Sequence, residues 1–214
     1  MSRYEVARFD EIEDLPGPGT LRWTPIRRRF DIRAFGVNAY TAQEVGQDVV
    51  EEHTEETLGH EELYVVVTGH ARFTLDGEEI DAPAGTLVFL RDPKVRRAAV
   101  AQEPGTTVLA LGGKPGEPYE VSVWEFDFAA AAKGKAGDYE GAIAEIDAGF
   151  ELHPEHPTLF YQRACWRALA GRPGAVDDLV QAVELGGERF RRWAQEDEDL
   201  DSIRADPSFP SAAA

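Results

Sequence analysis

The spacing of apolar residues changes after a segment rich in glycine and proline at residues 112–118. Before it, β-branched and aromatic residues alternate with polar ones in short runs, most clearly at residues 63–67 and 71–75. This pattern predicts strands, and the pairs Thr68-Gly69 and Asp76-Gly77 predict the turns that join them. We therefore expect consecutive antiparallel hairpins in this half of the chain.

After that segment, apolar residues recur at intervals of three and four, as at Tyr139, Ala142, Ile146 and Phe150. This spacing predicts helices, and breaks at residues 137–138, 153–154 and 171–174 separate them. We expect two helical hairpins, a capping helix over 188–194 and a short acidic segment after it.

These patterns divide the chain into two small domains of different class, all-β and all-α. The length of 214 residues is enough for two modest cores. The expected segments are an N-terminal arm at 1–29, a β domain at 30–113, a linker at 114–122, a helical domain at 123–205 and a tail at 206–214.

The chain is acidic, with a net charge of −18. Nucleic acids and anionic membranes would be repelled, so neither is expected as a partner. Cys165 is the single cysteine, which excludes an internal disulfide framework, and no apolar run has the length of a membrane span. These features favour a cytoplasmic location.

Two short motifs in the β domain resemble those of the cupin family. Glu62, six intervening residues and Gly69 fit the end of the first motif, G-x5-H-x-H-x3,4-E-x6-G. Pro83-x-Gly85 fits the P-x-G of the second motif, G-x5-P-x-G-x2-H-x3-N. The resemblance implies a cupin-type antiparallel β-barrel, or jelly roll, over about residues 30–113.

In the family this glutamate faces the barrel interior. Strand alternation places His60 and Tyr64 on the same face as Glu62. The resemblance therefore implies that these three residues, together with Arg96, line or border a small-molecule pocket. It also implies a homodimer, because cupins often pair through sheet edges.

Most of the usual cupin metal ligands are absent. Counting back from Glu62, the two histidines of the first motif fall at Glu55 and Thr57, and the histidine of the second falls at about Arg96. Three of the four usual ligands are thus missing, which favours a protein without a cofactor. We expect Arg96 to form an internal ion pair with Glu62 in a metal-free barrel, because a buried carboxylate is costly without a partner.

The helical half resembles tetratricopeptide repeats. Residues 137–154 and 171–187 are similar to one another, and their spacing is near the 34 residues of that repeat. Gly137, Tyr139, Ala142 and Pro154 fit the repeat in the first copy. The resemblance covers residues 123–205 and implies a surface for a protein partner.

Two functions remain open. One is a non-enzymatic barrel that binds a small molecule or serves as a structural head, fused to a protein-interaction module. The other is a metal-dependent cupin enzyme, such as an oxygenase, isomerase or epimerase. Its shifted site would hold iron, manganese, nickel or zinc through His53, Glu55, His60 and Glu62. Convergence of His53, His60 and Glu62 within metal-bonding reach would favour the second function.

Overall fold

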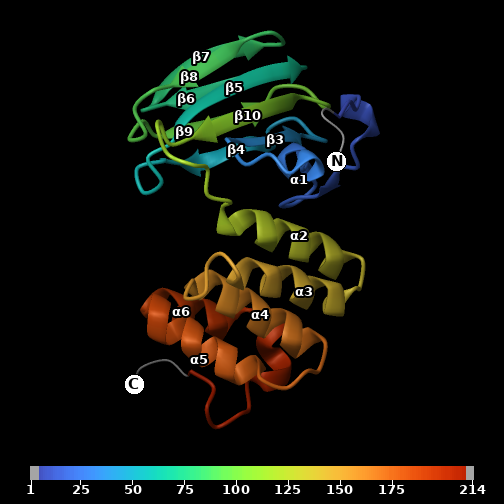
Figure 1. Ribbon diagram of the computed structural model, residues 1–214, viewed down its shortest axis with the longest axis vertical. Coiled ribbons are helices and arrows are strands. Elements are labelled where there is room, and N and C mark those ends of the chain that lie inside the picture. Colours follow the sequence, from blue (N-terminus) through green and yellow to red (C-terminus); the bar gives the residue numbers. More distant parts are fainter. Residues whose placement is uncertain (1–4, 211–214) are drawn as a thin grey trace. The chain divides into compact units, whose positions relative to one another are not determined.

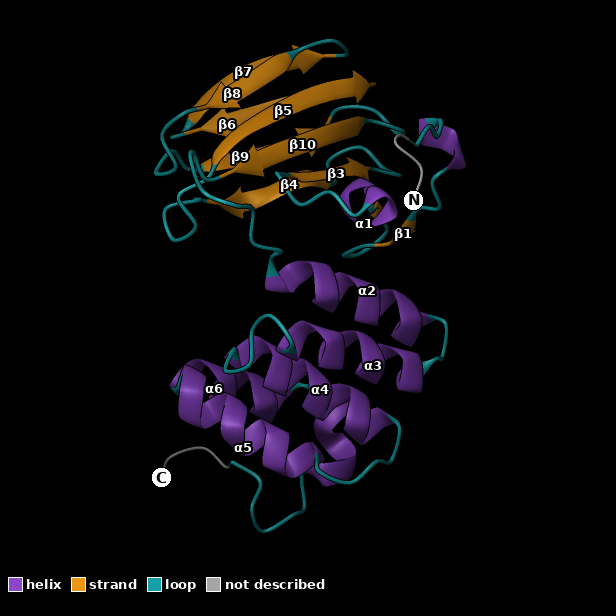
Figure 2. Ribbon diagram, viewed as in Figure 1, coloured by secondary structure: helices purple, strands orange, loops and turns teal. Residues whose placement is uncertain are grey.

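The computed structural model describes residues 5–210, and the chain divides into two compact units, Met1–Glu120 and Val121–Ala214. The strands lie in the first unit, and the second is helical (Figures 1 and 2). Parts of the expected arm and tail, at residues 1–4 and 211–214, fall outside the described residues.

The first unit consists of strands with two short helical segments. The elements in chain order are η1 (Phe9–Glu11), β1 (Leu15–Pro16), β2 (Arg22–Thr24), α1 (Ile26–Phe30), β3 (Gly36–Thr41), β4 (Asp48–His53), β5 (Glu61–Thr68), β6 (His70–Leu75), β7 (Glu78–Pro83), β8 (Leu87–Leu90), β9 (Arg97–Ala101) and β10 (Thr107–Gly113).

These strands form two antiparallel sheets, with orders β1-β2-β3-β10-β5-β8 and β4-β9-β6-β7. Within residues 5–210 no strand of one sheet is hydrogen-bonded to a strand of the other, so the expectation of a closed barrel is wrong. The predicted β6–β7 hairpin is confirmed, with Asp76 and Gly77 both at positive φ in its turn. The predicted β5–β6 hairpin is wrong, because at Gly69 the chain passes from one sheet to the other.

Buried side chains from both sheets form one apolar core. On β5, Tyr64 and Val66 are 2% and 1% exposed, whereas Val67 is 43% exposed. On β9, Ala99 and Ala101 are buried at alternate positions. The strand alternation predicted from the sequence therefore decides which side chains enter the core.

The N-terminal residues contribute to the larger sheet. β1 pairs with β2, and β2 pairs with β3. Trp23 of β2 is fully buried and Leu21 belongs to the apolar core. This part of the expected arm is thus a structural part of the β unit.

The second unit consists of helices at the predicted positions. They are α2 (Val123–Lys135), α3 (Tyr139–Phe150), α4 (Pro157–Leu169), α5 (Ala175–Gly186), α6 (Glu188–Glu196) and the 3-10 helix η2 (Glu198–Ile203). Consecutive α-helices pack against one another, and η2 packs on α4. The helical character is confirmed, whereas the likeness to tetratricopeptide repeats stays a prediction.

An ion-pair network joins α3, α4 and α5. Asp178 is buried and accepts hydrogen bonds from Arg163 at 2.9 and 2.7 Å and from Arg167 at 2.6 Å. Arg163 also donates to Asp147 at 2.7 Å. One buried carboxylate thus fixes two neighbouring helices.

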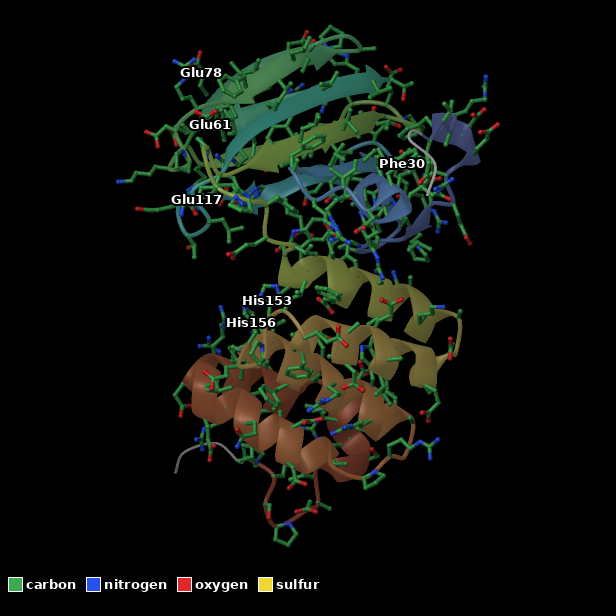
Figure 3. The ribbon with its side chains drawn as sticks, viewed as in Figure 1. Phe30, Glu61, Glu78, Glu117, His153 and His156 are labelled. Atoms are coloured by element: carbon green, nitrogen blue, oxygen red, sulfur yellow. The ribbon has the colours of Figure 1, made fainter. Side chains whose placement is uncertain are left out.

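A histidine caps α4. The ring nitrogen Nδ1 of His156 accepts a hydrogen bond from the Thr158 N–H at 3.3 Å. His153 lies beside it, with ring centroids 6.2 Å apart (Figure 3). The turn between α3 and α4 therefore uses its histidines structurally.

Across residues 5–210, the helices are too short or too polar to cross a membrane.

Candidate functional site

Polar side chains gather where the chain passes from β4 in one sheet to β5 in the other. His53 is the last residue of β4, Glu55 lies in the connecting loop and Glu62 is the second residue of β5. Arg97 begins β9 and pairs in register with His53. Both sheets and the loop between them therefore contribute to this cluster.

Three potential metal ligands converge here. The Nε2 atom of His53 lies 3.5 Å from Glu55 Oε1 and 3.8 Å from Glu62 Oε2. One donor atom from each of the three residues lies within 4.8 Å of the other two. In the part of the chain that the structure describes, this is the one group of three or more His, Cys, Asp or Glu residues with such spacing.

This donor set fits a divalent first-row metal. Bond lengths of about 2.0–2.2 Å at tetrahedral angles would place ligand atoms about 3.3–3.6 Å apart. The distances from His53 to the two carboxylates are within a few tenths of an ångström of that range. Glu55 Oε2 is also buried without a hydrogen-bond partner among the described residues. One imidazole and two carboxylates suit zinc, iron or manganese.

Two further side chains contact the carboxylates. The Tyr64 hydroxyl donates a hydrogen bond to Glu62 Oε2 at 2.6 Å. His60 Nδ1 lies 3.2 Å from Glu55 Oε2. Hydrogen bonds such as that of Tyr64 fix the orientation of metal-binding carboxylates in proteins, whereas the His60 contact lacks hydrogen-bond geometry. Tyr64 therefore supports the cluster, and His60 is not in the group of three converging donors.

The charges of the cluster shift the pKa values of its members. Burial lowers the pKa of His53, but the Glu62 carboxylate and the Glu51 carbonyl outweigh burial and leave it above its ordinary value. Burial raises the pKa of Glu62, but His53 and Tyr64 outweigh that effect and leave it below its ordinary value. Burial raises the pKa of Tyr64 strongly.

A buried arginine lies next to the carboxylates. The side chain of Arg97 is 0% exposed, and its Nε lies 3.7 Å from Glu62 Oε2. None of its three guanidinium nitrogens has a hydrogen-bond partner within residues 5–210. The cluster thus combines two carboxylates with one desolvated cation.

The structure corrects the expected role of Arg96. The side chain of Arg96 is 62% exposed and its guanidinium donates to Glu52 at 3.0 Å, so the internal ion pair of Arg96 with Glu62 is wrong. Counted from Pro83, the histidine of the second cupin motif corresponds to Val88, which is buried on β8. Because side chains alternate between the two faces of a strand, the next residue, Arg97, points into the core and is buried.

The sequence analysis thus named three residues that lie together in the structure and missed the arginine beside them. Of the four residues that the metal-dependent alternative names, His53, Glu55 and Glu62 converge, whereas His60 lies beside Glu55 and is outside the converging group. The sequence held no signal that separates Arg97 from Arg96, because alanines follow at both alternations; the structure shows that Arg97 shares the inward face with Ala99.

Three comparisons with known proteins were made. No protein-family model matches the sequence, and no curated protein matches it. Solved structures of cupin proteins are similar to it over about half of the chain. A cupin from Bacteroides fragilis is 18% identical with a TM-score of 0.43, over 57% of this chain and 93% of its own.

Two other structures give a similar result. An RmlC-like cupin from Shewanella frigidimarina is 16% identical with a TM-score of 0.40, over 54% of this chain and 95% of its own. A sugar phosphate isomerase of the cupin superfamily from Silicibacter pomeroyi is 17% identical with a TM-score of 0.43, over 55% of this chain and 83% of its own. The structural neighbours of the chain are thus cupin and RmlC-like proteins.

Proposed function

We propose that the β unit binds a divalent first-row metal ion and uses it to hold a small molecule. The observation that carries this proposal is the convergence of His53, Glu55 and Glu62 within 4.8 Å. These are three of the four residues named for a site shifted from the usual cupin spacing; the fourth, His60, contacts Glu55 instead.

The donor set leaves room in the coordination sphere of such an ion. Three protein ligands are typical of metal sites that also bind water or a substrate, whereas structural zinc sites are closed by four. When bound, the metal would act as a Lewis acid toward an oxygen of the small molecule. The His53 side chain is 34% exposed, so the cluster is reachable from solvent.

The protein residues have distinct roles in this proposal. His53, Glu55 and Glu62 hold the ion. Tyr64 fixes the Glu62 carboxylate by its hydrogen bond of 2.6 Å, and His60 lies against the carboxylate of Glu55. Loss of the Tyr64 hydrogen bond is expected to weaken metal binding by about 10- to 100-fold, because such contacts orient the ligands.

Arg97 provides a specific reason to consider a metal-free site. Its guanidinium lies 3.7 Å from Glu62, so it supplies one positive charge without any metal. A single cation leaves one of the two neighbouring carboxylates uncompensated, and Arg97 makes no hydrogen bond to either. A bound divalent ion would supply the positive charge that the second carboxylate lacks.

The test is metal titration of the full chain by calorimetry, together with elemental analysis of untagged protein purified without chelator. We expect one metal ion per chain in the wild type and its loss in Glu62→Gln. Glu61→Gln is the matched control: Glu61 (Figure 3) precedes Glu62 on β5, so strand alternation turns it to the other face, and it is outside the group of converging donors. Absence of metal binding in the wild type, or equal binding in Glu62→Gln, would refute the proposal.

A further inference from the structure

The guanidinium of Arg97 is a desolvated cation without hydrogen bonds. Its side chain is 0% exposed, and Nε, Nη1 and Nη2 have no hydrogen-bond partner among the described residues. An arginine in the protein interior normally has its donors satisfied, because an uncompensated buried charge costs several kcal/mol. Its nearest carboxylate oxygen, on Glu62, is 3.7 Å away, which is beyond hydrogen-bond distance. The N–H groups of the Arg97 guanidinium therefore have no hydrogen-bond acceptor within residues 5–210.

The position of Arg97 connects it to the metal ligands. Arg97 and His53 are register partners on adjacent strands, and Glu62 faces them from the opposite sheet. A molecule that reaches a metal ion held by His53, Glu55 and Glu62 would therefore be near the guanidinium. A guanidinium does not coordinate a metal ion, so Arg97 would instead donate hydrogen bonds to the molecule that the metal holds.

The charges in the cluster indicate one negative charge on that molecule. Glu55 and Glu62 contribute two negative charges, and Arg97 contributes one positive charge. A divalent ion with neutral His53 brings the sum to one positive charge. A monoanion makes the site neutral, whereas a dianion such as hydrogen phosphate leaves a net negative charge in a partly buried site.

We infer that the site binds a small organic acid, with its carboxylate hydrogen-bonded to the guanidinium of Arg97 and a second oxygen directed at the metal. A guanidinium presents paired N–H groups that match the two oxygens of a carboxylate. A 2-hydroxy or 2-oxo acid has the required second oxygen next to its carboxylate. This inference rests on the proposed function, because the second oxygen needs the metal.

The test is calorimetric titration of the full chain with glycolate, acetate and inorganic phosphate, each in metal-free and manganese-loaded protein. Glycolate is expected to bind the loaded wild type, with acetate weaker and phosphate weakest. In Arg97→Met, glycolate binding is expected to weaken at least about tenfold, the factor expected when hydrogen bonds to a charged group are lost. Manganese binding should persist in this variant.

Two further variants separate binding from folding. Arg96→Met removes the adjacent, exposed arginine and should bind glycolate like the wild type. Arg97→Lys keeps the charge and loses the paired N–H geometry, so it should fold like the wild type and bind glycolate more weakly. Circular dichroism and manganese affinity identify any variant that fails to fold.

The possible binding results distinguish failure of the carboxylate contact from failure of the metal site. Manganese binding without glycolate binding, equal glycolate binding in Arg97→Met, or phosphate binding tighter than glycolate would overturn the inference and leave the metal site. Absence of both manganese and glycolate binding would overturn both proposals. Arginine-dependent binding of glycolate without any manganese binding would support the carboxylate contact and overturn the metal site.

Discussion

The glycine that ends the first cupin-like motif, Gly69, offers a sharp test of the β architecture. It lies where the chain passes from β5 in one sheet to β6 in the other and has a φ of +73°. A Cβ atom there would lie 2.5 Å from Thr106 Oγ1 and 2.7 Å from Thr106 Cα. Gly69→Ala therefore imposes both an unfavourable backbone conformation and a steric clash.

The two contributions can be separated with Gly77. It lies in the β6–β7 turn at a φ of +88°, and a Cβ atom there would have no neighbour within 4 Å. Gly77→Ala should therefore lower the free energy of unfolding by the conformational cost alone, about 1–2 kcal/mol. Gly69→Ala adds overpacking of typically about 1–3 kcal/mol, so its total should be about 3 kcal/mol or more.

Thr106 has little freedom to relieve this clash. It is fully buried, its hydroxyl accepts a hydrogen bond from the His70 N–H at 3.1 Å, and the same hydroxyl lies 2.7 Å from the Glu103 carbonyl. Movement of Thr106 would break these contacts at a net cost of about 1 kcal/mol each.

The assay is native-state hydrogen exchange of the full chain, read by mass spectrometry on peptides from β5, β6 and β10. This measurement reports the free energy of opening of the β unit separately from that of the helices. A loss of protection in Gly69→Ala no larger than that in Gly77→Ala would refute the steric argument.

Two other predictions concern the helical unit. Asp178→Asn should lower the free energy of unfolding by about 2–3 kcal/mol, because a buried carboxylate that binds two arginines loses its charge. Asp147→Asn removes an exposed partner of Arg163 and should lower the free energy of unfolding by less than about 1 kcal/mol. Equal effects of the two substitutions in urea denaturation would contradict this reasoning. Burial raises the pKa of Asp127 from 3.8 to about 6. Since the folded state then holds its proton more tightly than the unfolded chain, wild-type stability falls as the pH rises through about 6. Asp127→Asn should therefore be more stable than the wild type at pH 8, by at most about 3 kcal/mol, and the difference should vanish near pH 3.5. If the stability difference between Asp127→Asn and the wild type in thermal denaturation were the same at pH 3.5 and pH 8, ionisation of the Asp127 carboxyl would not be its cause.

Local patterns predicted the change of class along the chain and most strands and helices after residue 30, but not the strands β1 and β2 in the expected arm. Alternation on β5 correctly placed Tyr64 and Val66 inside, and the spacing of three and four correctly predicted α3. The pairing of strands was harder to predict, because Gly69 ends a strand equally well in a hairpin or at a crossing between sheets. Sheet closure depends on contacts between distant strands, which the local pattern does not contain.

The candidate site also depends on contacts between strands that the local sequence pattern does not contain. His53, Glu55 and Glu62 were identified because the cupin-like motif fixed the position of Glu62 and its neighbours were close in sequence. Arg96 and Arg97 are adjacent and chemically identical, and the alanines after them suit either face of a strand. The choice between them follows from the pairing of β9 with β4, in which Arg97 is opposite His53.

The most direct test of the metal site is a crystal structure of the full chain grown with manganese or zinc, with anomalous diffraction recorded at the absorption edge of the metal. We expect one strong anomalous peak about 2.0–2.2 Å from His53 Nε2 and from one oxygen each of Glu55 and Glu62. The peak should be absent from crystals of Glu62→Gln and present in those of Glu61→Gln. A wild-type map without a peak between these side chains would contradict the account and leave Glu62 with only its protein neighbours, Arg97 and His53, as sources of positive charge in the described residues.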